Sequence, residues 1–191
     1  MEKLTGHKKI KTAVFISGRG SNLNNLIKFS NTKKSPIVIE LVIADKKAIG
    51  LKYAVQYKIK KKIINYKNNR IAEKKILLIL EKKKIKFICL AGFMKVLSAN
   101  FIKRFKEKII NIHPSYLPKY KGLNTSLRAL NNNEKFSGCT VHYVGEKIDS
   151  GKIIIQKKIK ITKKETETSL DKKIIQEEHK LYPAAIMKIF N

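Results

Sequence analysis

Two side chains near the middle of the chain, Asn111 and His113, could act together on a carbonyl group. They follow the apolar pair Ile109-Ile110 and lead into a Pro-bracketed loop over 114–118, which is typical of a buried strand that ends abruptly. Residues two apart on an extended backbone point to the same face, so the amide and the imidazole should lie side by side. An imidazole exchanges protons near neutral pH, and an amide can stabilise an oxyanion. The alternative is a structural histidine buried in a Pro-rich turn.

A second candidate is a glycine-rich turn near the N-terminus that could bind an anion. The apolar run 12–16 leads into Ser17-Gly18-Arg19-Gly20-Ser21-Asn22, and apolar residues at helical spacing follow. Backbone N–H groups at such a helix start attract phosphate. There is no Gly-Lys-Ser/Thr of a Walker A loop, and Leu23 replaces the third glycine of a dinucleotide fingerprint. A single phosphate on a small substrate therefore fits best, and the alternative is a tight turn capped by Ser21.

The third candidate is Asp149, in the loop 145–151 between strand-like runs over 138–144 and 152–156. An aspartate beside His113 would orient the imidazole, favour its charged form and raise its pKa. The sequence does not show that the two meet, and the alternative is a simple Asx turn.

The surrounding pattern indicates the elements that position these residues. Strand-like runs over 12–16, 37–44, 62–65, 86–90 and 109–113 alternate with helical patterns from 23 and over 50–58, 70–83 and 98–105. This rhythm predicts an α/β fold with a doubly wound, mostly parallel sheet, in which ligands bind beyond the carboxyl ends of the strands. The turn at 20–22, the loop 94–97 and His113 would share that edge. A C-terminal antiparallel hairpin and a terminal helix over 166–190, interrupted at Pro183, would complete a single domain over 1–191.

Composition narrows the class of protein further. No run of 18 apolar residues offers a membrane span, and the polar start at 1–10 lacks the features of a secretory signal. Cys89 and Cys139 lie in apolar runs and are expected to be buried free thiols, which fits a cytoplasmic location. No Cys/His cluster suggests a metal site.

The formal charge of +29 raises the question of a nucleic-acid partner. Only four of the 43 basic residues are arginines, whereas specific phosphate and base recognition favours arginine. Lysine, isoleucine and asparagine are enriched together along the whole chain, as A/T-rich codons would produce. We therefore expect nonspecific, salt-sensitive adhesion to nucleic acid but no specific nucleic-acid partner.

In combination, the motifs resemble those of the folate-dependent phosphoribosylglycinamide formyltransferases of purine biosynthesis. Five motifs occur in order and span most of the chain: Ser17–Leu23, Leu90–Met94, Asn111–Tyr120, Val141–Gly151 and Gln176–Pro183. The resemblance implies 10-formyltetrahydrofolate as the formyl donor, 5-phosphoribosylglycinamide as the acceptor, and no metal.

The resemblance also implies roles for individual residues. The catalytic set would be Asn111, His113 and Asp149. The acceptor would be bound by Gly20, Ser21, Asn22, Ile175, Gln176, Glu177 and Glu178. The folate slot would be lined by Arg70, Met94, Lys95, Val96, Leu97, Asn111, Gly145, Glu146, Lys147, Ile148 and Asp149. Where the family usually reads Pro-Gly-Leu-His-Thr-His, this chain has Lys121-Gly122-Leu123-Asn124-Thr125-Ser126, so both histidines are missing.

Three alternatives are kept open. Methionyl-tRNA formyltransferase shares the chemistry, and formyltetrahydrofolate deformylase is a related hydrolase, but each normally carries an additional domain for which 191 residues leave no room. A nonenzymatic protein that binds nucleic acid through lysine is the third. The expected partners are small-molecule substrates, without a membrane, in a monomer or homodimer.

Overall fold

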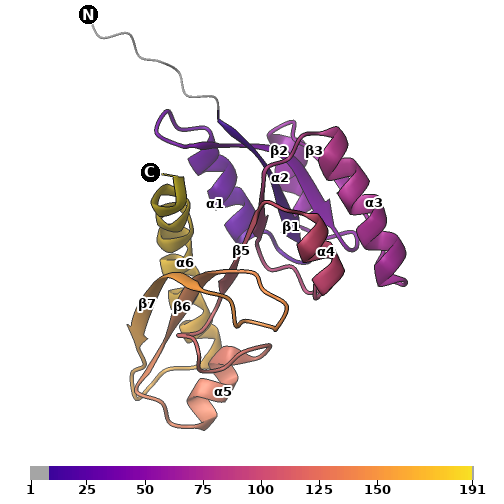
Figure 1. Ribbon diagram of the computed structural model, residues 1–191. Helices are drawn as coiled ribbons and strands as arrows, with labels where there is room; N and C mark the ends of the chain where they lie inside the picture. Colours follow the sequence, from indigo (N-terminus) through magenta and orange to yellow (C-terminus); the bar gives the residue numbers. More distant parts are fainter. Residues whose placement is uncertain (1–8, 191) are drawn as a thin grey trace, which may run out of the picture.

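The computed structural model describes residues 9–190, which form a seven-stranded sheet with helices on both faces (Figure 1). The strands are β1 (Ile10–Ile16), β2 (Ile37–Ala44), β3 (Lys60–Ile63), β4 (Phe87–Leu90), β5 (Lys108–His113), β6 (Phe136–Tyr143) and β7 (Ile153–Lys160). The helices are α1 (Ser21–Ser30), α2 (Leu51–Gln56), α3 (Asn69–Lys82), α4 (Ala99–Arg104), α5 (Thr125–Asn131) and α6 (Glu167–Phe190).

The sheet has the order β3-β2-β1-β4-β5-β6-β7. The first five strands in the chain pair in parallel, whereas β6 pairs antiparallel with both β5 and β7. The predicted doubly wound, mostly parallel sheet with a C-terminal antiparallel hairpin is confirmed. The order reverses between β1 and β4, and the loops after these strands diverge there, which is where open α/β sheets bind ligands.

Two hydrophobic clusters lie on the two faces of the sheet. In β1, Val14 and Ile16 join the cluster under α1, α2 and α6, whereas Ala13 and Phe15 join the cluster under α3 and α4. Successive side chains of a strand point to opposite faces, so a central strand covered on both sides is apolar throughout. The buried run of β1 therefore fixes the position of the glycine-rich turn that follows it.

The terminal helix α6 is continuous through Pro183, so the predicted interruption there is wrong. A proline in a helix leaves the carbonyl four residues earlier without its usual N–H donor. Here the Asn25 side chain donates its Nδ2–H to the His179 carbonyl at 2.6 Å, so that acceptor is satisfied from α1. The compensation comes from a residue that is far away in the sequence.

Smaller differences occur at the ends of elements. Strand β1 begins at Ile10, and β3 covers Lys60–Ile63 rather than the predicted 62–65, with every residue exposed at the sheet edge. Lysines on an edge strand discourage pairing with another chain. Most of the predicted polar start lies at residues 1–8, outside the described part, so the single-domain prediction over 1–191 stays a prediction. Within 9–190, no helix has the length and apolar character needed to cross a membrane.

Candidate active site

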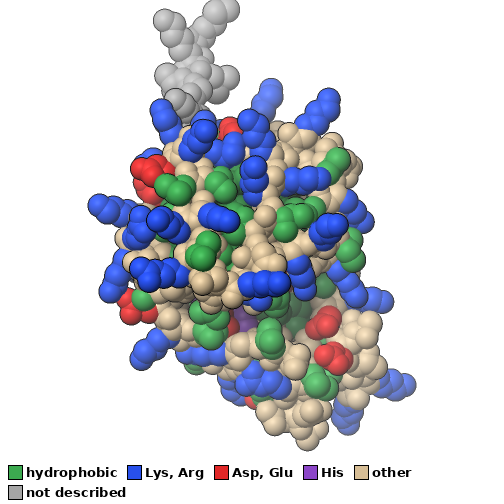
Figure 2. All heavy atoms as spheres, turned by 90° about the vertical axis from the view of Figure 1, so that its right-hand side faces the viewer, with side chains coloured by type: hydrophobic (Ala, Val, Ile, Leu, Met, Phe, Trp, Pro, Cys, Tyr) green, Lys and Arg blue, Asp and Glu red, His purple; other side chains and the backbone are tan. Residues whose placement is uncertain are grey.

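A cavity of about 680 Å³ opens at the carboxyl ends of β1, β4 and β5. It is lined by residues from strand ends, loops and the helices α1, α5 and α6, namely 18–22, 90–97, 111–114, 122–125, 142, 144–149, 171, 174, 175 and 178. Figure 2 shows the face that carries its mouth, where a histidine is visible in a recess among hydrophobic side chains and lysines are scattered all around. The three candidate elements of the sequence thus contribute to one cavity.

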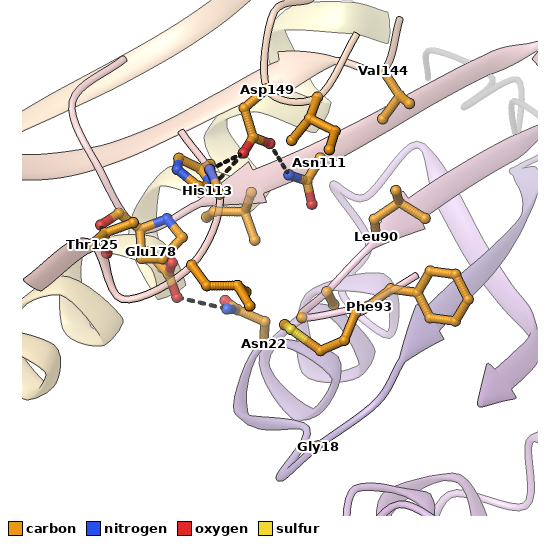
Figure 3. A pocket seen from close by; sticks show the side chains of 18 of the residues that line it. Gly18, Asn22, Leu90, Phe93, Asn111, His113, Thr125, Val144, Asp149 and Glu178 are labelled. Atoms are coloured by element: carbon orange, nitrogen blue, oxygen red, sulfur yellow. Dashed lines mark hydrogen bonds and ion pairs between the residues drawn. The ribbon is translucent and has the colours of Figure 1, made fainter. Parts of the chain in front are cut away.

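The structure brings Asn111, His113 and Asp149 together (Figure 3). His113 is buried, with Nδ1 3.3 Å from Asp149 Oδ2 and Nε2 2.9 Å from the Tyr120 carbonyl oxygen. Asn111 Nδ2 lies 3.5 Å from Asp149 Oδ1. Both imidazole nitrogens therefore face oxygen acceptors, an arrangement in which the protonated ring can donate two hydrogen bonds.

His142 is a fourth member of this cluster for which the sequence analysis assigned no role. It stands opposite Asn111 in the β5–β6 pairing, and its Nε2 lies 3.3 Å from Asn111 Nδ2 and 3.5 Å from Asp149 Oδ1. Its Nδ1 lies 2.8 Å from the Tyr143 carbonyl oxygen, which places a proton on Nδ1, and its Nε2 is within reach of both the Asn111 amide and the Asp149 carboxylate. Only the register of β5 against β6 reveals this contact.

In this cluster, burial and the neighbouring polar or charged groups shift the pKa values in opposite directions. Burial lowers the pKa of His113 below its ordinary value, and the Tyr120 carbonyl and Asp149 offset only part of that effect. The expectation that the pKa of His113 would be raised is therefore wrong in its net direction, although Asp149 acts in the expected sense. Burial alone would raise the pKa of Asp149, but hydrogen bonds from His142 and the Gly122 N–H, together with the nearby imidazoles, hold it below its ordinary value.

The glycine-rich turn has a geometry that only glycine suits. Gly20 precedes α1 with φ of 76°, and a Cβ there would come within 2.6 Å of the Gly50 Cα. No side chain caps the start of α1, so the alternative of a turn capped by Ser21 is wrong. The first N–H groups of a helix without such a cap can bind an anion.

A buried carboxyl lies beside the turn. Glu178, from α6, accepts a hydrogen bond from Asn22 Nδ2 at 2.7 Å, and Figure 3 shows the two side chains meeting. Burial raises the pKa of Glu178 to about 7, against the opposing effect of the Asn22 hydrogen bond. Asn22 Oδ1 is buried and has no hydrogen-bond partner within residues 9–190, so this corner can still accept a hydrogen bond.

Most of the other predicted residues also line the cavity, whereas three do not. Met94–Leu97 and Gly145–Ile148 form part of its wall, as does Ile175. Arg70 lies exposed in the first turn of α3, Gln176 is exposed, and Glu177 pairs with Lys180 at 2.6 Å. Roles for Arg70, Gln176 and Glu177 stay predictions.

Some other cavity residues had no role assigned from the sequence, or were noted only as departures from the family pattern. Asp171, from α6, accepts a hydrogen bond from Ser126 Oγ at 2.5 Å, and Arg19 and Asn124 complete the wall beside the turn and the start of α5. The positions of Asp171 and Asn124 depend on how α5 and α6 pack, which no local pattern indicates.

Neither a metal centre nor a disulfide is found in the described part of the chain. Among residues 9–190, no group of three or more His, Cys, Asp or Glu side chains is placed to hold a metal ion. Cys89 and Cys139 are buried free thiols, as predicted, and burial raises the pKa of Cys139 to about 12.

Comparison with known proteins identifies the class. The sequence pattern of the family described as formyl transferase matches residues 10–186. Phosphoribosylglycinamide formyltransferase of Haemophilus influenzae is 38% identical over 92% of this chain and 85% of its own length. The human trifunctional purine biosynthetic protein adenosine-3 is 40% identical over 97% of this chain, which spans only 19% of that protein.

Solved structures agree with the sequence relatives. The phosphoribosylglycinamide formyltransferase of Brucella melitensis superposes with a TM-score of 0.90 at 38% identity, covering 95% of this chain and 96% of the other. The Bacillus halodurans enzyme gives 0.91 at 32% identity, with 95% of each chain covered. The chain therefore belongs to the formyl transferase family, and the relatives above that it covers over most of their own length are named phosphoribosylglycinamide formyltransferase. The resemblance seen in the five sequence motifs is confirmed.

Proposed function

We propose that this protein transfers the formyl group of 10-formyltetrahydrofolate to the amine of 5-phosphoribosylglycinamide, as a step of purine biosynthesis. The observation that carries the proposal is the shape of the site, because one cavity joins the turn at 18–22 to Asn111, His113 and Asp149. A phosphate-bearing acceptor and a larger donor can then meet at the cluster. The family supports a folate-derived donor and small-molecule substrates.

Each end of the cavity suits one substrate. The acceptor's phosphate would lie against the N–H groups at Gly20, Ser21 and Asn22, because a helix start favours an anion. The rest of the acceptor would extend toward Glu178, which with Asn22 presents hydrogen-bond acceptors to hydroxyl or amine groups. The donor would lie between Met94–Leu97 and Gly145–Asp149, where Met94, Val96, Leu97 and Ile148 provide apolar wall.

The reaction would use the cluster as follows. The acceptor amine attacks the formyl carbon, and the new C–N bond leaves an oxyanion to which the Asn111 amide can donate. The amine must lose a proton, and the donor nitrogen must gain one as its bond to the formyl carbon breaks. Because burial lowers the pKa of His113, the neutral ring, which donates Nε2–H to the Tyr120 carbonyl, would take the first proton at Nδ1 and return it to the leaving nitrogen. Asp149 would stabilise the imidazolium in between.

The test is formyl transfer from 10-formyltetrahydrofolate to 5-phosphoribosylglycinamide, with wild type compared with His113→Ala. His179→Ala is the matched control, because that histidine lies on α6 outside the cavity wall. We expect transfer by wild type and the control, and loss of roughly a hundredfold or more in His113→Ala. A folded wild type without transfer would contradict the proposed acceptor, and initiator methionyl-tRNA would then be offered. Salt-dependent RNA binding that survives His113→Ala, without any transfer, would support a nonenzymatic protein.

The cytoplasmic location predicted from the sequence and the choice between monomer and homodimer stay predictions. The proposal depends on neither, because every residue it uses comes from one chain.

A further inference from the structure

We propose that Ser17 is a positioning residue that ties the folate-side loop to the anion-binding turn and thereby couples the binding of the two substrates. Ser17 directly follows β1 and is the first residue of the glycine-rich turn, but it does not line the cavity. Its side chain is buried, with 3% of its surface exposed. The proposal rests on the function proposed above, because it assigns one substrate to each side of this connection.

Two hydrogen bonds make the connection. The Ser17 backbone N–H donates to the Gly92 carbonyl at 3.0 Å, and Ser17 Oγ accepts from the Met94 N–H at 2.8 Å. Gly92 adopts φ of 73°, so the chain turns sharply there as it leaves β4. Met94 then begins the wall of the proposed folate slot. One serine thus contacts both ends of that sharp turn.

The turn is also fixed on its other side. The Gly50 N–H donates to the Gly18 carbonyl at 2.9 Å, and the backbones at Gly20 and Gly50 approach so closely that neither position has room for a Cβ. Because the main chain at Gly50 packs directly against the turn, the turn has no room to move in that direction. A change in the turn when an anion binds is therefore passed toward β4, where Ser17 contacts Met94.

Loss of the Ser17 hydroxyl should affect the folate side in particular. The Ser17 N–H to Gly92 bond would survive in Ser17→Ala, but the Met94 N–H would lose its acceptor. Without that acceptor the loop at Met94 is held less firmly in the free protein, so tetrahydrofolate must order it on binding, which should weaken folate binding by roughly tenfold. A merely structural role would instead lower the thermal stability and weaken both ligands alike.

Titration calorimetry with tetrahydrofolate, in the absence and presence of saturating 5-phosphoribosylglycinamide, distinguishes these possibilities. The two compounds cannot react, because tetrahydrofolate carries no formyl group. In wild type we expect the acceptor to tighten tetrahydrofolate binding severalfold. In Ser17→Ala we expect tetrahydrofolate alone to bind roughly tenfold more weakly, the acceptor alone to bind within about twofold of wild type, and the coupling to disappear.

Ser30→Ala is the matched control. Ser30 is equally buried and its hydroxyl donates to the Ile27 carbonyl at 2.8 Å, so the change removes one buried hydroxyl bond from α1 without touching the folate loop. This variant should retain the coupling. Coupling that persists in Ser17→Ala, or that is absent in wild type, would overturn the inference. A wild type that binds neither compound would instead contradict the proposed function.

Hydrogen exchange provides a second measurement that needs no variant. In wild type, 5-phosphoribosylglycinamide alone should slow exchange of the Met94 amide, since that N–H donates to Ser17. Unchanged exchange at Met94 while the acceptor is bound would overturn the inference, even if Ser17→Ala failed to fold.

Discussion

Replacing Glu178 with glutamine should stabilise this protein at neutral and alkaline pH and leave it unchanged in acid. Glu178 is 5% exposed, and burial raises its pKa from 4.5 to about 7. A glutamine has the same shape and can still accept the hydrogen bond from Asn22 Nδ2. The substitution therefore removes the buried charge and little else.

The direction follows from proton binding. Between pH 4.5 and 7 the folded protein keeps the Glu178 proton that the unfolded chain releases, so stability falls as the pH rises through this window. Below the window both states are protonated and the glutamate costs nothing. Above it the full cost is present, about 3 kcal/mol at ~1.4 kcal/mol for each pKa unit. Glu178→Gln should escape this loss.

The assay is denaturant unfolding of wild type and Glu178→Gln at pH 4.5, 6 and 8. We expect equal stability at the lowest pH and a difference that grows to about 3 kcal/mol at the highest. Glu177→Gln, the neighbouring carboxyl that pairs with Lys180 at the surface, should show no such growth. A difference between wild type and Glu178→Gln that is the same at every pH would refute the reasoning. We also expect weaker acceptor binding, which would explain why a destabilising carboxyl is tolerated there.

Three further outcomes are expected. Gly20→Ala should lower the free energy of unfolding by at least about 1–2 kcal/mol, because alanine disfavours the left-handed backbone there and its Cβ would also clash with Gly50. Gly18→Ala is the control: a Cβ at Gly18 meets open space, so this variant should unfold near the wild-type temperature. Tyr182→Phe removes a fully buried hydroxyl that donates to the carbonyls ending β4 and preceding Asn111, and should cost about 1–3 kcal/mol in denaturant unfolding. Asp149→Asn should lower the pKa of His113 further, so the acid limb of the pH–rate profile should move to lower pH while the rate falls. An unmoved profile would exclude that role.

The sequence was sufficient to predict the sheet, because periodicity and burial agree along it. The apolar run at 12–16 favoured a central strand, and the glycine-rich turn follows it directly, as the structure confirms for β1. Pro183 shows where local reasoning ends. It is tolerated inside α6 because Asn25, on another helix, replaces the missing donor, and no pattern near residue 183 contains that information.

Site residues could be predicted where they lie on a strand or helix whose direction the sequence indicates. Asn111 and His113 share a strand end, and their neighbourhood followed from spacing alone. The contact between His113 and Asp149 could not be predicted, because it depends on how the loop at 145–151 folds over β5. The position of His142 could not be predicted either, because it depends on the register of β6 against β5. The direction of the His113 pKa could not be predicted either, since burial outweighs the charge of a neighbour that the sequence only suggests.

The charge of the cavity differs from the charge of the chain. Over the whole sequence basic residues outnumber acidic ones by 43 to 14. The cavity wall instead holds Arg19, Lys95 and Lys147 against Glu146, Asp149, Asp171 and Glu178. If a substitution bias toward lysine had acted equally on every position, the cavity wall would show the same excess of basic residues as the whole chain. Its different balance indicates that carboxyl groups are required there. The balance inside the cavity therefore supports an intact chemical site beneath a surface whose lysines are scattered and follow composition, and it weighs against a protein that acts only by binding polyanions.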